Sequence, residues 1–171
     1  VGCQLFSEPG AGSDLANLST KAEHDGEEWI ITGQKVWTSG AHYSDIGEII
    51  ARTDFDMPKH KGLSYFYIDM RAPGVEIKPI KQLTGDADFN EVYFTDVRVS
   101  DRQRLGEVGQ GWQVALTTLM NERAAIGGGI YHAVGNRFLA AFHDGLFLIV
   151  GTGAMAGFAG NAVFQGNLFA L

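Results

Sequence analysis

Short runs of β-branched and aromatic residues, separated by turn residues, fill the chain from residue 19 to about residue 105. Residues 19–23 and 29–32 flank the pair Asp25-Gly26, a favoured hairpin turn. Further strand candidates cover residues 46–53, 63–69, 75–80 and 91–99, with Gly, Pro and Asp clusters between them. This spacing is typical of an all-β barrel or sandwich, so we expect a mainly β fold.

The spacing of the apolar residues changes at Gly111. Apolar residues then recur at spacings of three, four and seven, at Trp112, Leu116, Leu119, Ile126 and Ile130. This spacing marks one face of a helix. We expect a helix from residue 111 to about residue 126 or beyond, weakened in its second half by three consecutive glycines, 127–129.

The composition changes near residue 136, and beyond it only Arg137 and Asp144 are charged. Residues 145–171 carry no charge, and as a helix they would be long enough to cross a ~30 Å hydrocarbon layer. Six glycines, several amide side chains and the lack of basic or aromatic flanks argue against such a span. We therefore expect a loosely packed or foreign tail, with a membrane helix as the alternative.

Charge and cysteine content exclude several classes of function. Thirteen Lys and Arg against 20 Asp and Glu give a net charge of -7 without a basic block, which argues against a nucleic-acid partner. The single cysteine, Cys3, excludes an internal disulfide or a Cys-rich zinc site, and the histidines have no metal-ligand spacing. The first residues lack the pattern of a secretory signal, so we expect a bacterial cytoplasmic or a mitochondrial matrix setting.

The segment Phe6-Ser7-Glu8-Pro9-Gly10-Ala11-Gly12-Ser13-Asp14 is dense in small residues. Its glycines would let backbone N–H groups approach an anion, and Ser7, Ser13 and Asp14 add polar partners. A phosphate or the polar edge of a cofactor fits this segment. A plain turn explains it equally well.

A second segment, Lys35-Val36-Trp37-Thr38-Ser39-Gly40, places an indole beside two hydroxyl groups at the end of a strand. An indole can cover a planar ring system while hydroxyl groups bind its polar edge. A core tryptophan at the end of a hairpin is the alternative.

The third candidate is the pair Glu122-Arg123 on the expected helix. Both residues fall on or beside its apolar face, where a charge is costly unless it is paired or used. This placement indicates a functional cleft, with a solvated pair at the rim of the face as the alternative.

Taken together, these segments resemble the acyl-CoA dehydrogenases. The string from Cys3 to Asp14, the Trp-Thr-Ser-Gly segment, residues 89–98 and the approach from Gly106 to Trp112 match that family in order and spacing over residues 1 to about 135. The resemblance implies a flavin-binding middle β-barrel domain over residues 1–105 and the first helix of a C-terminal helical domain over 106–135. Residues 136–171 are an atypical Gly- and Phe-rich apolar tail.

The resemblance also implies roles for individual residues. Ser7 would bond the flavin pyrimidine of FAD, Trp37 would pack on the isoalloxazine, and Ser39 would reach its N5 edge. The implied FAD-binding residues are Gln4, Phe6, Ser7, Gly12, Ser13, Trp37, Thr38 and Ser39, and the implied acyl-CoA-binding residues are Ser13, Asn121, Glu122 and Arg123.

The implied reaction is α,β-dehydrogenation of an acyl-CoA to a trans-2-enoyl-CoA, with Glu122 as the base. A carboxylate in a desolvated site has a raised pKa and is a stronger base. An electron-transfer flavoprotein would accept the electrons, and the full-length protein would be a homo-oligomer.

The sequence departs from the family pattern in several places. Met120 stands where some relatives have an Asp that contacts pantetheine, and Ser100 replaces a usual Pro. The N-terminal helical domain and most of the C-terminal helices are missing, which favours a fragment. The alternatives are an acyl-CoA oxidase or flavin monooxygenase on the same scaffold, and a remnant without catalytic activity.

Overall fold

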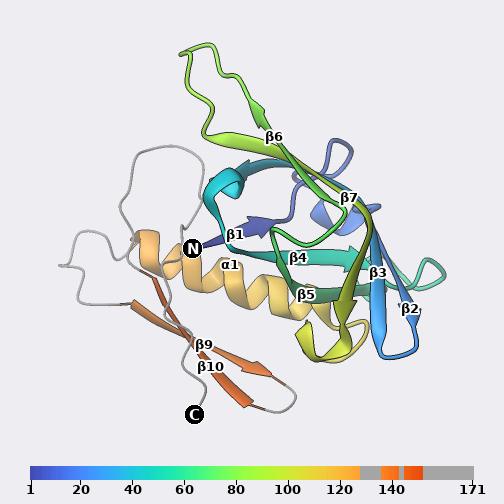
Figure 1. Cartoon of the computed structure of the whole chain (residues 1–171). Helices are drawn as coiled ribbons and strands as arrows, with labels where there is room; N and C mark the ends of the chain where they lie inside the picture. The colour runs from blue at the N-terminus through green and yellow to red at the C-terminus, as the bar shows by residue number, and fades with distance from the viewer. Residues whose placement is uncertain (128–135, 143–144, 152–171) are drawn as a thin grey trace.

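The computed structural model describes residues 1–127, 136–142 and 145–151, and the surroundings of side chains as far as Asn121. Its strands and its helix follow in order (Figure 1): β1 (Gly2–Leu5), β2 (Lys21–Asp25), β3 (Glu28–Ser39), β4 (Ile46–Arg52), β5 (Leu63–Asp69), β6 (Val75–Ile80), β7 (Phe89–Ser100), β8 (Arg104–Leu105), α1 (Gly111–Gly127), β9 (Asn136–Phe142) and β10 (Gly145–Gly151). Three short 3₁₀ turns lie between strands: η1 (Leu15–Asn17), η2 (Ala41–Tyr43) and η3 (Asp101–Gln103).

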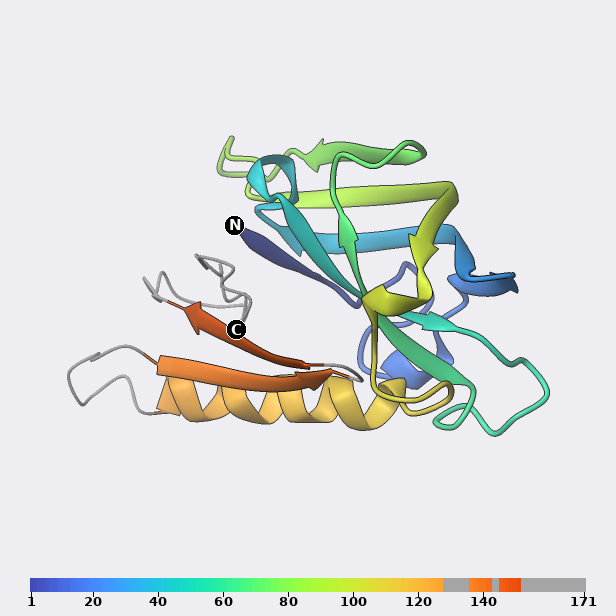
Figure 2. The same ribbon diagram turned by 60° about the horizontal axis from the view of Figure 1, so that its bottom comes forward.

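Eight strands form one sheet, in the order β6-β7-β3-β2-β4-β5-β8, and β1 adds to β4 in parallel. The sheet curls so that its inner face encloses a core (Figure 2). The expected mainly β fold followed by a helix is confirmed. The expected hairpin is β2–β3, with Gly26 at a left-handed φ of 68° in its turn. Strands β1 and β8 were not predicted, because they are too short for an alternation of apolar and polar residues to be visible.

Successive side chains of a strand point to opposite faces of the sheet, which explains why the buried residues form two separate cores. The inner faces of the strands build the first core, which includes Ile49, Phe66 and Val97. Because β4 and β5 are buried on both faces, their alternate residues Ile50 and Tyr65 join a second cluster, which lies between the sheet, residues 6–18 and α1. This second core joins the N-terminal loop to the helix.

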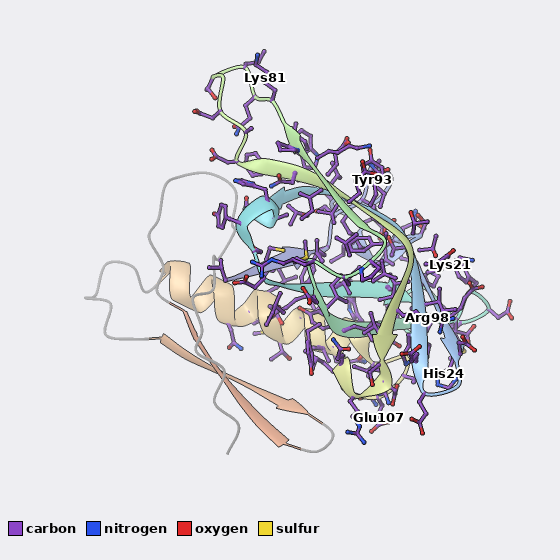
Figure 3. All side chains as sticks on the ribbon, in the orientation of Figure 1. Lys21, His24, Lys81, Tyr93, Arg98 and Glu107 are labelled. Carbon is purple, nitrogen blue, oxygen red and sulfur yellow. The ribbon has the colours of Figure 1, made fainter. Side chains whose placement is uncertain are left out.

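The outer face of β2, β3 and β7 is polar (Figure 3). Arg98 on β7 reaches across to β2 and β3, where its Nη1 lies 3.1 Å from the Asp25 carboxylate and 2.9 Å from that of Glu28. Such solvated pairs contribute little to stability.

Helix α1 confirms the expected helix, and Trp112 and Leu119 of the expected face pack against the second core, but Leu116 does not. Leu116 is 42% exposed, whereas Ala115 is fully buried. The reason is a close approach to β5: a Cβ added at Gly111 would lie 2.5 Å from the backbone of Ser64. Small residues at positions 111 and 115, one turn apart, therefore face the sheet, and the larger Leu116 turns outward.

Where the structure describes it, the tail is extended and not helical. Strands β9 and β10 pair antiparallel, with Phe142 opposite Gly145. Residues 145–151 are therefore extended, which contradicts a membrane helix beginning at residue 145. No helix of the described residues is long and apolar enough to cross a membrane. The rest of the tail, residues 152–171, lies outside the described residues, as do residues 128–135 of the expected helix region.

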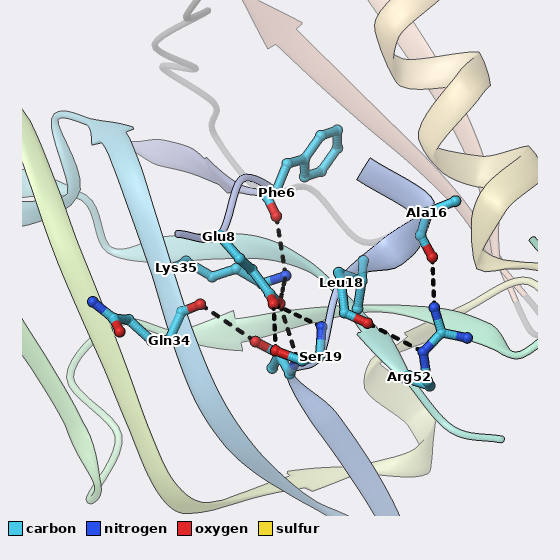
Figure 4. A network of polar contacts seen from close by, with 9 residues as sticks. Phe6, Glu8, Ala16, Leu18, Ser19, Gln34, Lys35 and Arg52 are labelled. Atoms are coloured by element: carbon cyan, nitrogen blue, oxygen red, sulfur yellow. Dashed lines mark hydrogen bonds and ion pairs between the residues drawn. The ribbon is translucent and has the colours of Figure 1, made fainter. Parts of the chain in front are cut away.

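A buried ion pair fixes the N-terminal loop on β3 (Figure 4). The Nζ of Lys35, which has no exposed surface, lies 2.9 Å from Oε1 of Glu8 and donates a second bond of 3.1 Å to the carbonyl oxygen of Phe6. The Glu8 carboxylate also accepts bonds from the backbone N–H groups of Ser19 and Thr20 and from the Ser19 hydroxyl. The loop is thereby held at both of its ends.

The pair shifts both of its pKa values. Burial raises the pKa of Glu8, but the Lys35 ammonium and the hydrogen bonds from Thr20 and Ser19 outweigh burial and bring that pKa down to about 2. Burial lowers the pKa of Lys35 to about 8, although Glu8 opposes the shift. Both groups are therefore charged at neutral pH.

Removing one charge of this pair leaves the other charge buried without a partner. Glu8→Gln should lower the free energy of unfolding by roughly 3–5 kcal/mol at pH 7, because it leaves the buried Lys35 ammonium without its counter-charge. Since the folded pKa of Glu8 lies below its ordinary 4.5, its contribution is complete above pH 4.5 and is lost as pH falls toward 2. Urea unfolding of the wild type and of Glu8→Gln at several pH values measures both effects.

The matched control is Asp14→Asn, which removes an exposed carboxylate of the same loop, 2.7 Å from Lys59 Nζ. This substitution should leave the free energy of unfolding almost unchanged. Equal losses in the two variants would contradict the assigned role of the buried pair.

Candidate functional site

Two segments that are distant in the sequence lie side by side at the end of β3. The N–H of Val36 donates a 2.8 Å hydrogen bond to the carbonyl oxygen of Ser7, next to the bond from Lys35 to Phe6. Strand β1, which carries Gln4, also lies beside β3. The structure thus brings together two groups of predicted cofactor-binding residues: Gln4, Phe6 and Ser7 from one segment, and Trp37, Thr38 and Ser39 from the other.

Two buried polar atoms in this region have no hydrogen-bond partner. They are Nε2 of Gln4 and Oγ1 of Thr38, and no other side-chain atom of the described residues is both buried and unpaired. Leaving a buried polar group unpaired costs about 1–3 kcal/mol, so each such group in a folded protein calls for an explanation. Both residues belong to the predicted cofactor-binding set. A ligand with polar atoms on its edge would satisfy them, and this chemistry fits FAD.

Trp37 has a backbone conformation that is rare for a bulky residue. Its φ is 60°, in the left-handed region, and its side chain is 57% exposed. Such a conformation costs roughly 1–3 kcal/mol and is most often found at functional sites. The ring of Phe89 meets the indole edge to face, with 6.1 Å between ring centroids. Trp37 is therefore not the core tryptophan of the alternative reading, and its exposure suits a stacking platform.

Gly12 and Ser13 lie on the outside of the loop. Both are exposed, and a Cβ added at Gly12 would meet nothing within 4 Å, so open space surrounds this backbone. The next residue, Asp14, is tied to Lys59 in the loop between β4 and β5. No hydrogen bond among the described residues joins Ser13 to Trp37 or Thr38. Of the two serines in the predicted FAD set, Ser7 is bonded to β3 through the Val36 N–H.

Helix α1 passes the same region. Leu119 packs against the second core, to which Phe6 and Ala115 belong. Asn121 is half-buried on the helix, and Glu122 follows Leu119 by three residues, on the same side one turn later. The side chains of Glu122 and Arg123 lie outside the described part of the structure, so their predicted roles stay predictions.

Three residues that shape this region are not among the predicted site residues: Glu8 and Lys35 of the buried pair, and Asn90. Alternation could have identified two of them. Lys35 falls in step with the buried Trp29 and Ile31 along β3, and Asn90 falls in step with Val92 along β7, so both face inward and need polar partners. Nothing local in the sequence identifies Glu8 as the partner of Lys35.

This chain is similar to known proteins in sequence and in structure. The sequence profile of the acyl-CoA dehydrogenase middle domain matches residues 3–97. The acyl-CoA dehydrogenase FadE34 of Mycobacterium tuberculosis is 56% identical over 134 residues, which are 78% of this chain and 19% of that protein. The acyl-CoA dehydrogenase IpdE1 of the same organism is 53% identical over 121 residues, or 71% of this chain and 31% of that protein.

Solved structures give the same result. A variant of the Tcur3481-Tcur3483 steroid ACAD superposes with a TM-score of 0.70 at 40% identity, over 75% of this chain and 34% of that one. The glutaryl-coenzyme A dehydrogenase in its glutaryl-CoA complex gives a TM-score of 0.66 at 31% identity, over 74% of this chain and 33% of that one. This chain covers only 19% and 31% of the two curated relatives. Its match to the middle-domain profile, over more than half of its residues, shows that it belongs to the acyl-CoA dehydrogenase family.

Proposed function

We propose that this chain is the FAD-binding part of an enzyme that oxidises an acyl-CoA thioester to a trans-2-enoyl-CoA. The observation that carries the proposal is the unpartnered buried Oγ1 of Thr38, next to the exposed Trp37 on β3, together with the unpartnered Nε2 of Gln4 on the neighbouring strand β1. In the same proposal, residues 1–105 form the flavin-binding domain, residues 106–135 begin a helical domain, and 136–171 are a separate tail.

The residues at the end of β3 would hold FAD in place. Trp37 offers an indole face, while Thr38 and Gln4 offer polar atoms that FAD can pair. Ser7 lies next to Val36, where its hydroxyl group can reach the same ligand, and Ser39 follows on the strand. Bound FAD would supply a two-electron acceptor. Gly12 and Ser13, with open space around Gly12, would bind a more distant part of FAD or the acyl-CoA.

Glu122 would remove the α-proton of the acyl-CoA. It stands one turn beyond Leu119 on α1, a helix that packs against the loop carrying Phe6 and Ser7. Neighbouring Asn121 and Arg123 would contact the substrate, together with Ser13. A carboxylate in a desolvated site is the stronger base that a weakly acidic C–H next to a thioester requires.

Substrate and partners belong to the same proposal. The similarity to a steroid ACAD suggests a bulky, steroid-derived acyl-CoA among the substrates to test. The proposed partners are an electron-transfer flavoprotein and further copies of the protein. The two curated relatives are from a bacterium, which favours a bacterial cytoplasmic setting.

The substitution Thr38→Val should change the stability of the chain and its affinity for FAD in opposite directions. Valine keeps the shape of threonine and removes the unpaired hydroxyl group, so the ligand-free chain should gain about 1 kcal/mol of unfolding free energy. The same change should weaken FAD binding about tenfold, because a ligand bond is lost. Urea unfolding without ligand and FAD titration followed by visible absorption measure the two effects.

Thr20→Val provides the matched control. Thr20 is equally buried, but its hydroxyl group is paired, so this variant should lose stability and retain FAD affinity. A Thr38→Val chain that is less stable than the wild type and binds FAD unchanged would refute the proposed role of Thr38.

Glu122→Gln tests the base. In the complete protein that carries these residues, the substitution should retain FAD and slow α-proton removal by about 10²–10⁴-fold. Deuterium exchange at the α-carbon of the acyl-CoA measures this step directly. Glu27→Gln, in the exposed β2–β3 turn, should exchange at the wild-type rate. Unchanged exchange in Glu122→Gln would place the base elsewhere.

A further inference from the structure

The backbone around Trp37 is a bulge that needs support. Pairing between β3 and β7 shifts there: Lys35 stands opposite Val92 and Thr38 opposite Asn90, so β3 holds one extra residue. Trp37 takes up the distortion with its φ of 60° and directs its indole outward. The exposed indole gains little from burial, so it cannot itself offset the cost of this conformation. Groups on either side of the bulge must hold it.

The first support lies before the bulge. Lys35 is tied to Glu8 at 2.9 Å and to the Phe6 carbonyl at 3.1 Å, and the next residue, Val36, donates to Ser7 at 2.8 Å. All of these bonds are short, and Lys35 is fully buried. They fix the chain as far as the residue directly before Trp37.

The second support lies after the bulge. Asn90 is fully buried on β7, and its Nδ2 donates a 2.9 Å bond to the carbonyl oxygen of Thr38. Its Oδ1 lies 3.2 Å from Nδ1 of His42 in η2. Because Nδ2 is committed to Thr38, the orientation of the amide is defined, and Asn90 fixes the residue directly after Trp37.

We propose that Lys35 and Asn90 are positioning residues, which hold Trp37 strained and exposed before any ligand arrives. The inference rests on the proposed function, because the ligand would be FAD. A platform that is already in place does not have to be ordered when the ligand binds, which strengthens binding without adding a contact. Neither residue needs to touch the ligand to have this effect.

The first test needs no ligand. Trp37 gives one indole N–H signal in a ¹H–¹⁵N spectrum, which is identified by its absence in Trp37→Phe. Asn90→Leu removes the donor to Thr38 at similar volume, so the Trp37 signal should broaden or split while those of Trp29 and Trp112 stay in place. Ser64→Ala, which removes a buried hydrogen-bonding hydroxyl on β5, is the matched control and should leave the Trp37 signal unchanged.

The second test is a double-mutant cycle on FAD affinity. Asn90→Leu should weaken binding about tenfold in the wild-type background and less than about twofold in a Trp37→Ala background, because Asn90 acts through Trp37. If Asn90→Leu weakened binding only by disturbing the fold, the loss of FAD affinity would be the same in both backgrounds. If Asn90→Leu does not fold, Asn90→Ser takes its place in both tests.

The outcomes separate the two proposals. Failure of the wild-type chain to bind FAD would contradict the proposed function, and the indole signal would still decide the positioning role. A Trp37 signal that stays sharp and unmoved in the Asn90 variant would overturn that role. So would equal losses of FAD affinity in the two backgrounds.

Discussion

The buried pair of Glu8 and Lys35 is the interaction on which the site depends. It joins a loop near the N-terminus to the middle of β3, and no apolar contact could replace it without releasing the backbone groups that Glu8 accepts from. Burying two charges is costly unless their hydrogen bonds are complete. Here the Glu8 carboxylate accepts from the backbones of Ser19 and Thr20, and the Lys35 ammonium donates to that of Phe6. One pair therefore joins three segments of the chain: residues 6–8, residues 19–20 and β3.

The region held by this pair is locally unfavourable. Thr38 and Gln4 bury atoms without partners, and Trp37 adopts a strained backbone, while the surrounding strands are well packed. Local costs of this kind persist only where the surrounding structure enforces them. They occur on the neighbouring strands β1 and β3, although Gln4 and Thr38 are 34 positions apart in the sequence, and this is the physical reason for placing a ligand there.

Much of the fold could be predicted, because turns, strands and the helix each leave a pattern within a short stretch of sequence. The Asp25-Gly26 turn, the strand runs and the helix from Gly111 follow from turn chemistry and period. The burial of Ala115 and the exposure of Leu116 on α1 could not be predicted, because the close approach of Gly111 to Ser64 depends on a strand 47 positions earlier. For the same reason no pattern pairs Glu8 with Lys35 or Asn90 with Thr38. Ser7, Trp37 and Thr38 were identified through motif order, and their proximity is a tertiary result.

The most direct measurement is the visible absorption spectrum of the purified chain after incubation with FAD and desalting. We expect flavin bands that remain with the protein, because Trp37, Thr38 and the Ser7 loop are positioned by contacts within this chain. A colourless protein fraction, from a chain shown to be folded by its far-UV circular dichroism, would contradict the claim that these residues form the flavin site.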